Sequence, residues 1–374
     1  MIQRSLQKTI ASRLFDGKAI LIFGPRQVGK TTLLKLLTQG NDKVLWLNGD
    51  EPDVQELFAH LTSTRLKPYL GKANLLIVDE AQRIADIGLK LKIIIDALEE
   101  VQLIATGSSS FELANKVNEP LTGRKFEYKL LPFSFGEMVN EQGLLKEKRM
   151  LAHRMIYGYY PEIVNHPGDE KERLQLLTES YLYKDILVWE QIHKPDKLTK
   201  LLQALAYQVG AQVSYNELGQ ICGLDAKTVE KYILVLEQAF IIFRLRSFKR
   251  NLRNELKISK KIYFYDNGIR NAIIANFDQI ETRKDIGALW ENFLMAERQK
   301  YISYHQLWVK PWFWKTKDQQ EIDYLEEADG KLAAYEFKWN PKAKYKFPRS
   351  FKDTYVDSSF KLIHKDNVED FLLD

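Results

Sequence analysis

Residues 24–31 read Gly24-Pro25-Arg26-Gln27-Val28-Gly29-Lys30-Thr31, and this stretch decides the fold of the amino-terminal part of the chain. Its spacing fits the phosphate-binding pattern G-x-x-x-x-G-K-[ST] at every specified position. The apolar run 19–23 predicts a buried strand before the loop, and residues 32–37 predict a helix after it. A strand, a glycine-containing turn and a helix in this order predict a nucleotide-binding loop on a parallel sheet.

The residue types of this loop suit a triphosphate that carries Mg²⁺. Glycine lets backbone amides approach phosphate oxygens closely, and the positive end of the following helix adds a fixed dipole. We expect Lys30 to reach the terminal phosphates and the Thr31 hydroxyl to be a magnesium ligand. The predicted nucleotide contacts are Gly24, Pro25, Arg26, Gln27, Val28, Gly29, Lys30, Thr31, Thr32 and Ser108. ATP and Mg²⁺ are therefore the expected cofactors.

Two adjacent acids, Asp79 and Glu80, follow a second buried-strand run at 75–78. We expect Asp79 to hold the magnesium ion through water and Glu80 to polarise the attacking water, because adjacent acids serve these roles beside a metal and a phosphate. Two acids at the end of a strand are common by themselves, so this interpretation depends on the phosphate loop. Together the two motifs predict an ATPase.

A third strand run, 101–105, leads into the polar stretch 106–110, which includes Ser108 and resembles the tip that senses the γ-phosphate in AAA-type ATPases. Arg124 follows a glycine, and it is expected to stabilise charge on the transferred phosphoryl group, either within the chain or across a subunit boundary. A surface arginine after a turn is the alternative. The predicted catalytic residues of the ATPase are Glu80, Lys30 and Arg124. A homo-oligomer follows only if Arg124 or Arg26 acts on a second copy.

Length and composition limit the class of protein. A chain of 374 residues is long enough for two or three domains, and a hydrophobic content of 45% argues against disorder. No apolar stretch approaches the eighteen or so residues of a membrane span, and the amino terminus lacks the pattern of a signal peptide, so we expect a cytoplasmic protein without a membrane partner. The single cysteine, Cys222, is expected to be a small core residue.

Basic residues are clustered although the net charge is only +5. Residues 244–261 contain eight basic residues and one acid, and residues 338–352 contain six basic residues, no acid and several aromatic residues. Such mixtures suit phosphate contacts and base stacking, while a solvated charged face explains either cluster alone. DNA is the predicted partner, through regions 226–261 and 338–352.

Residues 198–245 predict a winged helix-turn-helix. A capped helix at 215–222 is followed by a tight turn and by a third helix at 226–238, which carries lysines on its open side, where a recognition helix presents groups to a DNA groove. Two strands, 241–246 and 261–265, are expected to form the wing. The same module also serves as a protein-packing unit, so DNA contact is not implied by the fold alone.

Near the carboxyl end, strand runs 321–325 and 332–339 flank Asp329-Gly330, the pair most favoured in two-residue hairpin loops. Such a hairpin pairs Asp323 with Glu336 and Glu321 with Lys338 on one face. Directly opposed Cβ atoms lie about 5 Å apart, and two carboxylates that close repel unless a cation or a proton lies between them. A divalent metal held by Asp323 and Glu336 would resolve the conflict.

This arrangement, Asp323 and then Glu336-x-Lys338 on the neighbouring strand, resembles the PD-(D/E)XK restriction-endonuclease-like core. Glu291, in a helical stretch, matches the acid that this family often places on a preceding helix. The resemblance implies that the carboxylates bind Mg²⁺ and that Lys338 positions water or stabilises charge. An exposed hairpin face with alternating charges, and a degenerate version of the fold that only holds DNA, are the alternatives.

Taken in order, these motifs span nearly the entire chain and resemble the bacterial and archaeal AAA-type ATPases that have a carboxyl-terminal domain of unknown function with nuclease-like character. The resemblance implies an α/β protein with an amino-terminal parallel-sheet P-loop ATPase domain, a central winged helix-turn-helix and a carboxyl-terminal α/β restriction-endonuclease-like domain. The expected domains are the ATPase domain at 1–140, a helical linker at 141–197, the winged helix at 198–270 and the nuclease-like domain at 271–374. No sensor arginine or lid-helix pattern of the broader AAA+ group is found, so a ring is not implied.

The leading prediction is an Mg²⁺-dependent ATPase that binds DNA and couples its nucleotide state to remodelling or translocation of that DNA. Two alternatives stay open. The first is an ATP-gated nuclease that uses Glu291, Asp323, Glu336 and Lys338. The second is a nucleotide-dependent regulatory switch that binds a protein partner and turns ATP over slowly, if at all.

Overall fold

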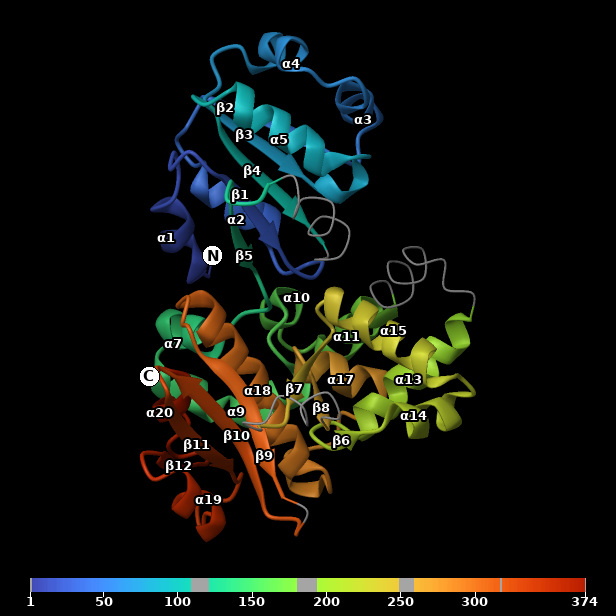
Figure 1. The fold of residues 1–374 in the computed structure, drawn as a ribbon, viewed down its shortest axis with the longest axis vertical. Coiled ribbons are helices and arrows are strands. Elements are labelled where there is room, and N and C mark those ends of the chain that lie inside the picture. The colour runs from blue at the N-terminus through green and yellow to red at the C-terminus, as the bar shows by residue number, and fades with distance from the viewer. Residues whose placement is uncertain (1, 109–120, 180–193, 249–258, 317, 374) are drawn as a thin grey trace. The chain divides into compact units, whose positions relative to one another are not determined.

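The computed structural model describes residues 2–108, 121–179, 194–248, 259–316 and 318–373. Its contacts divide the chain into two compact units. The first unit is Met1–Leu131 together with Gln238–Phe240, and the second is Pro132–Glu237 together with Ile241–Asp374. Figure 1 shows both units, and each is described below by itself.

The first unit is built on a five-stranded parallel sheet with the strand order β2-β3-β4-β1-β5. Its three inner strands are buried along their whole length, which explains why they are continuous apolar runs in the sequence. The strands are β1 (Ala19–Phe23), β2 (Val44–Asn48), β3 (Leu75–Asp79), β4 (Gln102–Gly107) and β5 (Lys125–Lys129). This confirms the predicted amino-terminal parallel sheet.

One helix precedes β1, and the other helices that the structure describes in this unit follow β1, β2 and β3 (Figure 1). They are α1 (Leu6–Ala11), α2 (Lys30–Leu37), α3 (Pro52–Ala59), α4 (Ser63–Leu70), the short 3-10 turn η1 (Ala81–Arg83) and α5 (Ile87–Ala97). Because all five strands run the same way, their carboxyl ends lie at one edge of the sheet, which is where open α/β sheets bind ligands.

The second unit begins with helices and contains two sheets. Its helices are α7 (Phe135–Gln142), α8 (Leu144–Arg149), α9 (Leu151–Tyr157), α10 (Pro161–Val164), α11 (Glu170–Thr178), α13 (Pro195–Tyr207), α14 (Tyr215–Cys222), α15 (Ala226–Gln238), α17 (Asn267–Ile273), η3 (Ile280–Thr282), α18 (Ile286–Tyr304), α19 (Arg349–Thr354) and α20 (Glu369–Leu372). The first sheet, with the order β6-β8-β7, is antiparallel. Its strands are β6 (Gln212–Val213), β7 (Ile242–Arg246) and β8 (Lys260–Phe264).

The helices expected at 215–222 and 226–238 are confirmed as α14 and α15. Ser214 caps α14 by accepting a hydrogen bond from the Glu217 amide, and Gly223 ends it with a φ of 64° in the left-handed region. Cys222 lies in the core, as predicted. Burial raises the pKa of its thiol.

The second sheet has the order β12-β11-β10-β9. Its strands are β9 (Lys310–Lys315), β10 (Glu321–Ala328), β11 (Lys331–Phe337) and β12 (Ser359–Ile363). The predicted hairpin is confirmed, because Tyr324 pairs with Tyr335 in antiparallel register and both loop residues, Asp329 and Gly330, have positive φ angles. The backbone amide of Phe248, just after β7, donates to the Phe313 carbonyl of β9 at 2.6 Å and so joins the two sheets.

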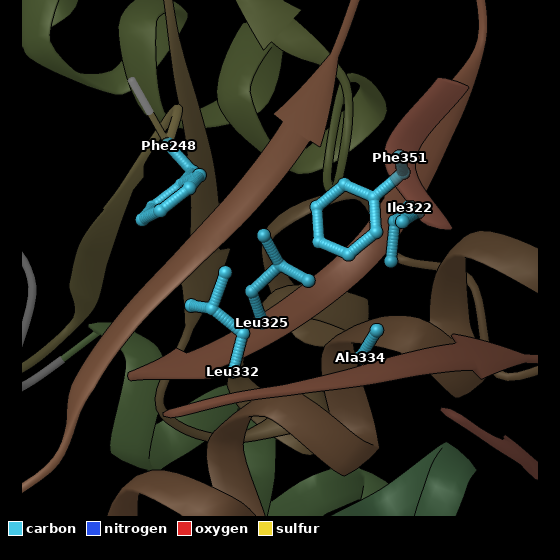
Figure 2. Packing of buried hydrophobic residues seen from close by; sticks show 6 residues of the cluster. All are labelled: Phe248, Ile322, Leu325, Leu332, Ala334 and Phe351. Atoms are coloured by element: carbon cyan, nitrogen blue, oxygen red, sulfur yellow. The ribbon is translucent and has the colours of Figure 1, made fainter. Parts of the chain in front are cut away.

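Apolar side chains from β10, β11 and α19 pack on one side of the second sheet (Figure 2). Phe351 of α19 lies over Ile322 and Ala334, and Phe248 meets the same cluster from the end of β7. The cluster consists of Phe248, Ile322, Leu325, Leu332, Ala334 and Phe351. It fixes the hairpin, and with it Asp323 and Glu336, which lie two residues along from Leu325 and Ala334 and so share their face of β10 and β11.

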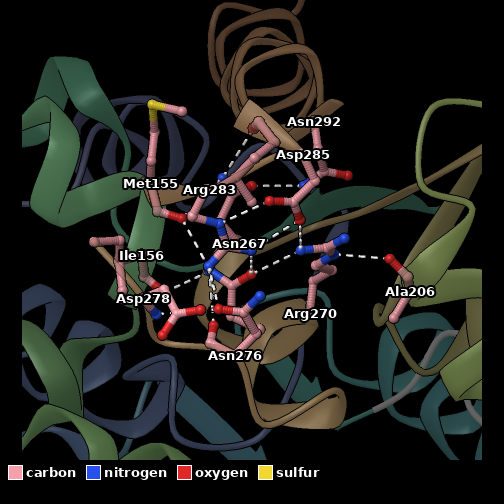
Figure 3. A network of polar contacts seen from close by, with 12 residues as sticks. Met155, Ile156, Ala206, Asn267, Arg270, Asn276, Asp278, Arg283, Asp285 and Asn292 are labelled. Carbon is pink, nitrogen blue, oxygen red and sulfur yellow. Dashed lines mark hydrogen bonds and ion pairs between the residues drawn. The ribbon is translucent and has the colours of Figure 1, made fainter. Parts of the chain in front are cut away.

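A buried polar network fastens helix α17 to its neighbours (Figure 3). The Arg270 guanidinium, 1% exposed, donates to the Ala206 carbonyl at 2.8 Å and binds Asp285 at 2.7 Å. The Asn267 side chain donates to the carbonyls of Met155 and Leu289. These bonds tie α9, α13, α17 and α18 together, which explains why polar residues fill this part of the core.

In the described part of the chain, every helix is too short or too polar to span a bilayer.

Candidate functional site

The phosphate loop lies between the carboxyl end of β1 and the start of α2, as predicted. Gly29 has a φ of 90°, a left-handed conformation that favours glycine. At Gly24, an added Cβ would lie 1.9 Å from the Leu130 carbonyl oxygen, so the close approach of the two backbones requires glycine there too. Arg4, which is 5% exposed, holds the far side of the loop by donating to the Val28 carbonyl at 2.7 Å.

Lys30 is the first residue of α2 and is buried in the loop. Its ammonium donates to the carbonyls of Gly24 and Pro25, each at 2.9 Å. The loop backbone therefore holds the charge of this lysine at the carboxyl edge of the sheet, where a triphosphate is expected to bind.

The two predicted magnesium ligands of this unit meet. The Thr31 hydroxyl donates to Asp79 Oδ2 at 2.8 Å. Asp79 Oδ1 accepts from the Thr106 hydroxyl and from the Glu80 amide, so the carboxylate is held on both sides. A hydroxyl and a carboxylate are the hard oxygen ligands that Mg²⁺ prefers, and this donor set fits the ion. The sequence placed Thr106 only in the polar stretch expected to sense the γ-phosphate, and its contact with Asp79 was not predicted.

Glu80 stands at the end of β3 in a left-handed conformation, with a φ of 48°. Its carboxylate accepts a hydrogen bond from the Gln82 side chain at 2.6 Å, and the same amide group donates to the Ser108 hydroxyl at 3.0 Å. The structure therefore links the expected water-polarising acid and the expected γ-phosphate sensor through Gln82, a residue that the sequence analysis missed.

Arg124 lies away from these residues. It precedes β5, its carbonyl accepts from the Ala19 amide at 2.9 Å, and its guanidinium binds Asp96 at 2.8 Å. Ala19 begins β1, whereas the phosphate loop follows the end of that strand, a separation of roughly 16 Å at about 3.3 Å per residue. The structure does not bring Arg124 to Lys30 within one chain.

The second unit contains a cleft of about 670 Å³, and three of the predicted nuclease-like residues line it: Glu291 of α18, Asp323 of β10 and Glu336 of β11. Lys338 joins them by binding Glu336 Oε1 at 2.7 Å. The ladder between β10 and β11 keeps the predicted register but ends at Tyr324 opposite Tyr335, before the expected pairs Asp323–Glu336 and Glu321–Lys338. The Lys338 ammonium binds Glu336.

Asp323 and Glu336 form a pair of carboxylates with unequal surroundings. Asp323 Oδ2 accepts from the Phe337 amide at 3.0 Å, while Glu336 Oε2 is buried without a hydrogen-bond partner. The neighbouring Tyr345 hydroxyl donates to the Glu321 carbonyl oxygen. Burial, with repulsion from Glu336 as the next cause, raises the pKa of Asp323 to about 6. Burial likewise raises the pKa of Glu336.

Glu291 is held by the three-stranded sheet. Its Oε1 accepts from the Tyr263 hydroxyl at 2.6 Å and from the Lys261 ammonium at 3.0 Å. Lys261 also binds Glu321 at 2.7 Å. Burial raises the pKa of Glu291 to about 7, and Lys261 opposes this rise. Within the described ranges, no group of three or more His, Cys, Asp or Glu side chains is arranged to hold a metal ion.

The first basic cluster is only partly exposed in the part of the chain that the structure describes. Arg244 pairs with Glu237, and Lys261 is buried in the cleft, whereas Arg246 is exposed. Four of its members, Lys249, Arg250, Arg253 and Lys257, lie outside the described residues.

The other predicted basic surfaces face outward. On α15, Lys227 and Lys231 are exposed. Between β11 and the end of α19, five exposed basic residues form what we call the carboxyl-terminal basic surface: Lys342, Lys344, Lys346, Arg349 and Lys352.

Comparisons with known proteins fit this division. Residues 16–139 match the model of the AAA domain family. Residues 148–280 match a domain of unknown function, DUF8612, and residues 286–370 match another, DUF4143. The phosphate loop, Asp79 and Glu80 lie within the residues that match the AAA domain.

Whole-chain relatives have no assigned function. An uncharacterized protein of Mycobacterium tuberculosis is 24% identical over 341 residues, which cover 90% of this chain and 74% of the relative. An uncharacterized protein of Methanocaldococcus jannaschii is 22% identical over 404 residues, covering 97% of this chain and 88% of the relative. Among solved structures, the Walker-type ATPase PABY2304 of Pyrococcus abyssi is 14% identical, with a TM-score of 0.51 over 73% of this chain and 96% of that chain.

The AAA match and the fold shared with the Pyrococcus ATPase confirm the amino-terminal prediction at the level of the domain. Residues 16–139 are therefore similar to an AAA domain and have a parallel-sheet P-loop fold. A P-loop fold implies nucleotide binding, with Mg²⁺ as its usual companion.

Proposed function

We propose that the chain is an Mg²⁺-dependent ATPase that binds DNA and couples its nucleotide state to remodelling or translocation of that DNA. The observation that carries the ATPase part is the contact of Thr31 with Asp79, 2.8 Å apart beside the phosphate loop. These two residues would hold Mg²⁺, which neutralises charge on phosphate oxygens when it is bound. Lys30 and the loop amides would bind the phosphates themselves.

The neighbouring residues suggest how hydrolysis is controlled. Glu80 would orient the attacking water and accept its proton. Its carboxylate shares the Gln82 side chain with Ser108, so a phosphate contact at Ser108 would shift the hydrogen bonding of Glu80. Gln82 is therefore proposed as the link between sensing the γ-phosphate and activating water.

Arg124 is proposed to act across a subunit boundary, because it lies at the amino edge of the sheet and pairs with Asp96 there. An arginine from another copy is an established way to stabilise phosphoryl-transfer charge. The test is sedimentation with and without a non-hydrolysable ATP analogue. A chain that stays monomeric in both would exclude this role.

The DNA-binding part of the proposal is supported by the exposed lysines of α15 and by the carboxyl-terminal basic surface. The order of α13, α14, α15 and a small antiparallel sheet is that of a winged helix, which we propose for residues 198–270. The other proposed domains are 1–140 for the ATPase, 141–197 for a helical linker and 271–374 for a nuclease-like domain.

The deciding experiment is ATP turnover by the full chain with and without DNA, at low salt, across single-stranded, duplex and forked DNA. We expect DNA to raise turnover of the wild type and to have no effect on the Lys30→Ala variant, which should be inactive throughout. Absence of stimulation by every DNA form would contradict the coupling. Absence of turnover in all tubes would contradict the ATPase itself.

A second candidate, an ATP-gated nuclease, is favoured by one observation. Glu336 Oε2 is buried in the cleft beside Asp323 and lacks a hydrogen-bond partner, which is unusual unless a ligand completes the site. Two carboxylates suffice for Mg²⁺, since this ion keeps several waters. The test is DNA cleavage with Mg²⁺ or Mn²⁺ by the wild type and by Asp323→Ala. Equal cleavage by both would exclude this cleft.

A further inference from the structure

Lys261 places a positive charge inside the cleft of the second unit. Its side chain is only 3% exposed, and its ammonium binds Glu291 at 3.0 Å and Glu321 at 2.7 Å. A lysine this deeply buried is rare unless it is paired. The strand β8 that carries it belongs to the three-stranded sheet, whereas its partners come from α18 and β10.

The other cations of the cleft have different positions. Lys315 binds the second oxygen of Glu321, at 3.1 Å, with a side chain that is 23% exposed. Lys338 binds Glu336, at 2.7 Å. Lys261 is therefore the cation that lies between Glu291 and Glu321 and compensates their charge where water is scarce.

The geometry around Lys261 is close to that of a bound metal. The ammonium has carboxylate oxygens of Glu291 and Glu321 at 2.7 to 3.0 Å, and Asp323 acts on its charge from nearby. Oxygen ligands of Mg²⁺ lie at about 2.1 Å, so each oxygen would need to move by less than about 1 Å to hold a divalent ion instead. The Tyr263 hydroxyl fixes the shared oxygen of Glu291 in place.

We propose that the Lys261 ammonium occupies, and thereby closes, a second divalent-cation position formed by Glu291 and Glu321. The inference rests on the proposed metal site at Asp323 and Glu336, and it assigns that site a single divalent ion.

The test counts Mn²⁺ ions bound by the nucleotide-free full chain, using the electron paramagnetic resonance signal of unbound Mn²⁺ at about pH 8, where carboxylates are ionised. Lys261→Met removes the ammonium and retains much of the side-chain volume. Lys315→Met is the matched control, because it removes a cation from the same Glu321 without opening the space beside Glu291. Asp323→Asn tests the proposed metal site.

Lys261→Met should bind one Mn²⁺ more than the wild type, or bind it at least tenfold more tightly, whereas Lys315→Met should match the wild type. An unchanged count and affinity in Lys261→Met, or an equal gain in Lys315→Met, would overturn the inference. Wild-type binding that Asp323→Asn does not reduce would instead overturn the proposed metal site. If Lys261→Met does not fold without metal, Mn²⁺ should restore its circular dichroism spectrum, and failure to do so would also overturn the inference.

Discussion

At the scale of single residues, the Asp79 carboxylate organises the phosphate site. One oxygen is held by Thr106 and by the Glu80 amide, which leaves the other aligned with Thr31. Supporting bonds of this kind orient metal ligands. The sequence predicts Asp79 from its motif, but Thr106 reaches it only through the parallel pairing of β3 with β4, in which Val78 lies opposite Ala105. Strand order is a tertiary property that a single sequence does not reveal.

Replacing Glu80 by Gln should separate ATP binding from hydrolysis. The amide retains the shape of the side chain but accepts a proton poorly, so we expect the turnover number to fall by about 100-fold while the affinity for ATP stays the same. Steady-state turnover and calorimetric titration with ATP measure the two quantities. Unchanged turnover would remove Glu80 from the mechanism. A turnover loss without any loss of biological function would favour the regulatory switch.

Stability of the second unit should depend on pH through Glu291. Burial raises the pKa of its carboxyl group from 4.5 to about 7, so between these values the folded chain binds more protons than the unfolded chain. Stability at this site is therefore highest below about pH 4.5 and is lost as the pH rises to about 7, by up to roughly 3 kcal/mol. Urea unfolding at several pH values measures it. In Glu291→Gln, the free energy of unfolding should depend less on pH. A pH dependence as steep as that of the wild type would contradict the prediction.

At the scale of elements, local sequence patterns predicted the strands, turns and helices whose formation depends on residues close together in the sequence. The apolar inner strands, the Asp329-Gly330 hairpin and the capped helix α14 are of this kind. The location of Lys261 was missed, because residues 244–261 were interpreted as one basic surface. Side chains alternate along β8, so adjacent lysines point to opposite faces, and only the tertiary structure shows that one face is a cleft.

The polar network around α17 leads to a prediction about the stability of the second unit. Arg270→Met would leave the Ala206 carbonyl without its donor and remove one of the two arginines that bind Asp285. We expect the free energy of unfolding of the second unit to fall by about 3 kcal/mol. Urea denaturation followed by circular dichroism measures this change. Lys284→Met, an exposed change nearby, is the control and should have little effect.

At the scale of the whole molecule, the chain divides into two compact units, and each contains one of the two candidate sites. At the amino-terminal site, the position of the loop 24–31 was predictable because its motif is contiguous, whereas the contacts of Thr106 and Gln82 were missed and Arg124 lies elsewhere. The cleft of the second unit gathers residues from α18, β8, β10 and β11, and of these only the Asp323, Glu336 and Lys338 set has a local pattern. The measurement of ATP turnover with and without DNA tests whether the two units act together.

DNA affinity should weaken with salt if the carboxyl-terminal basic surface contacts phosphates. Replacing Lys342 and Lys344 by Ala should lower the affinity for all DNA sequences alike and reduce the slope of log K against log salt by about 2, because two phosphate contacts are lost. Fluorescence anisotropy over a range of salt concentrations measures both effects. Replacing the exposed Lys284 and Lys331 by Ala is the control. An unchanged slope after replacement of Lys342 and Lys344 would show that DNA does not contact these two lysines.

The Arg4 guanidinium has a practical consequence for anyone who shortens this protein. It bridges the Val28 carbonyl, at 2.7 Å, and the Leu131 carbonyl, at 2.5 Å, and so braces the phosphate loop from behind. A truncated protein that lacks Arg4 would keep every residue expected to contact the nucleotide. We expect it to bind the nucleotide more weakly all the same. Weak binding by such a truncated protein would then reflect the lost support of the phosphate loop by Arg4 and not the loss of a nucleotide contact.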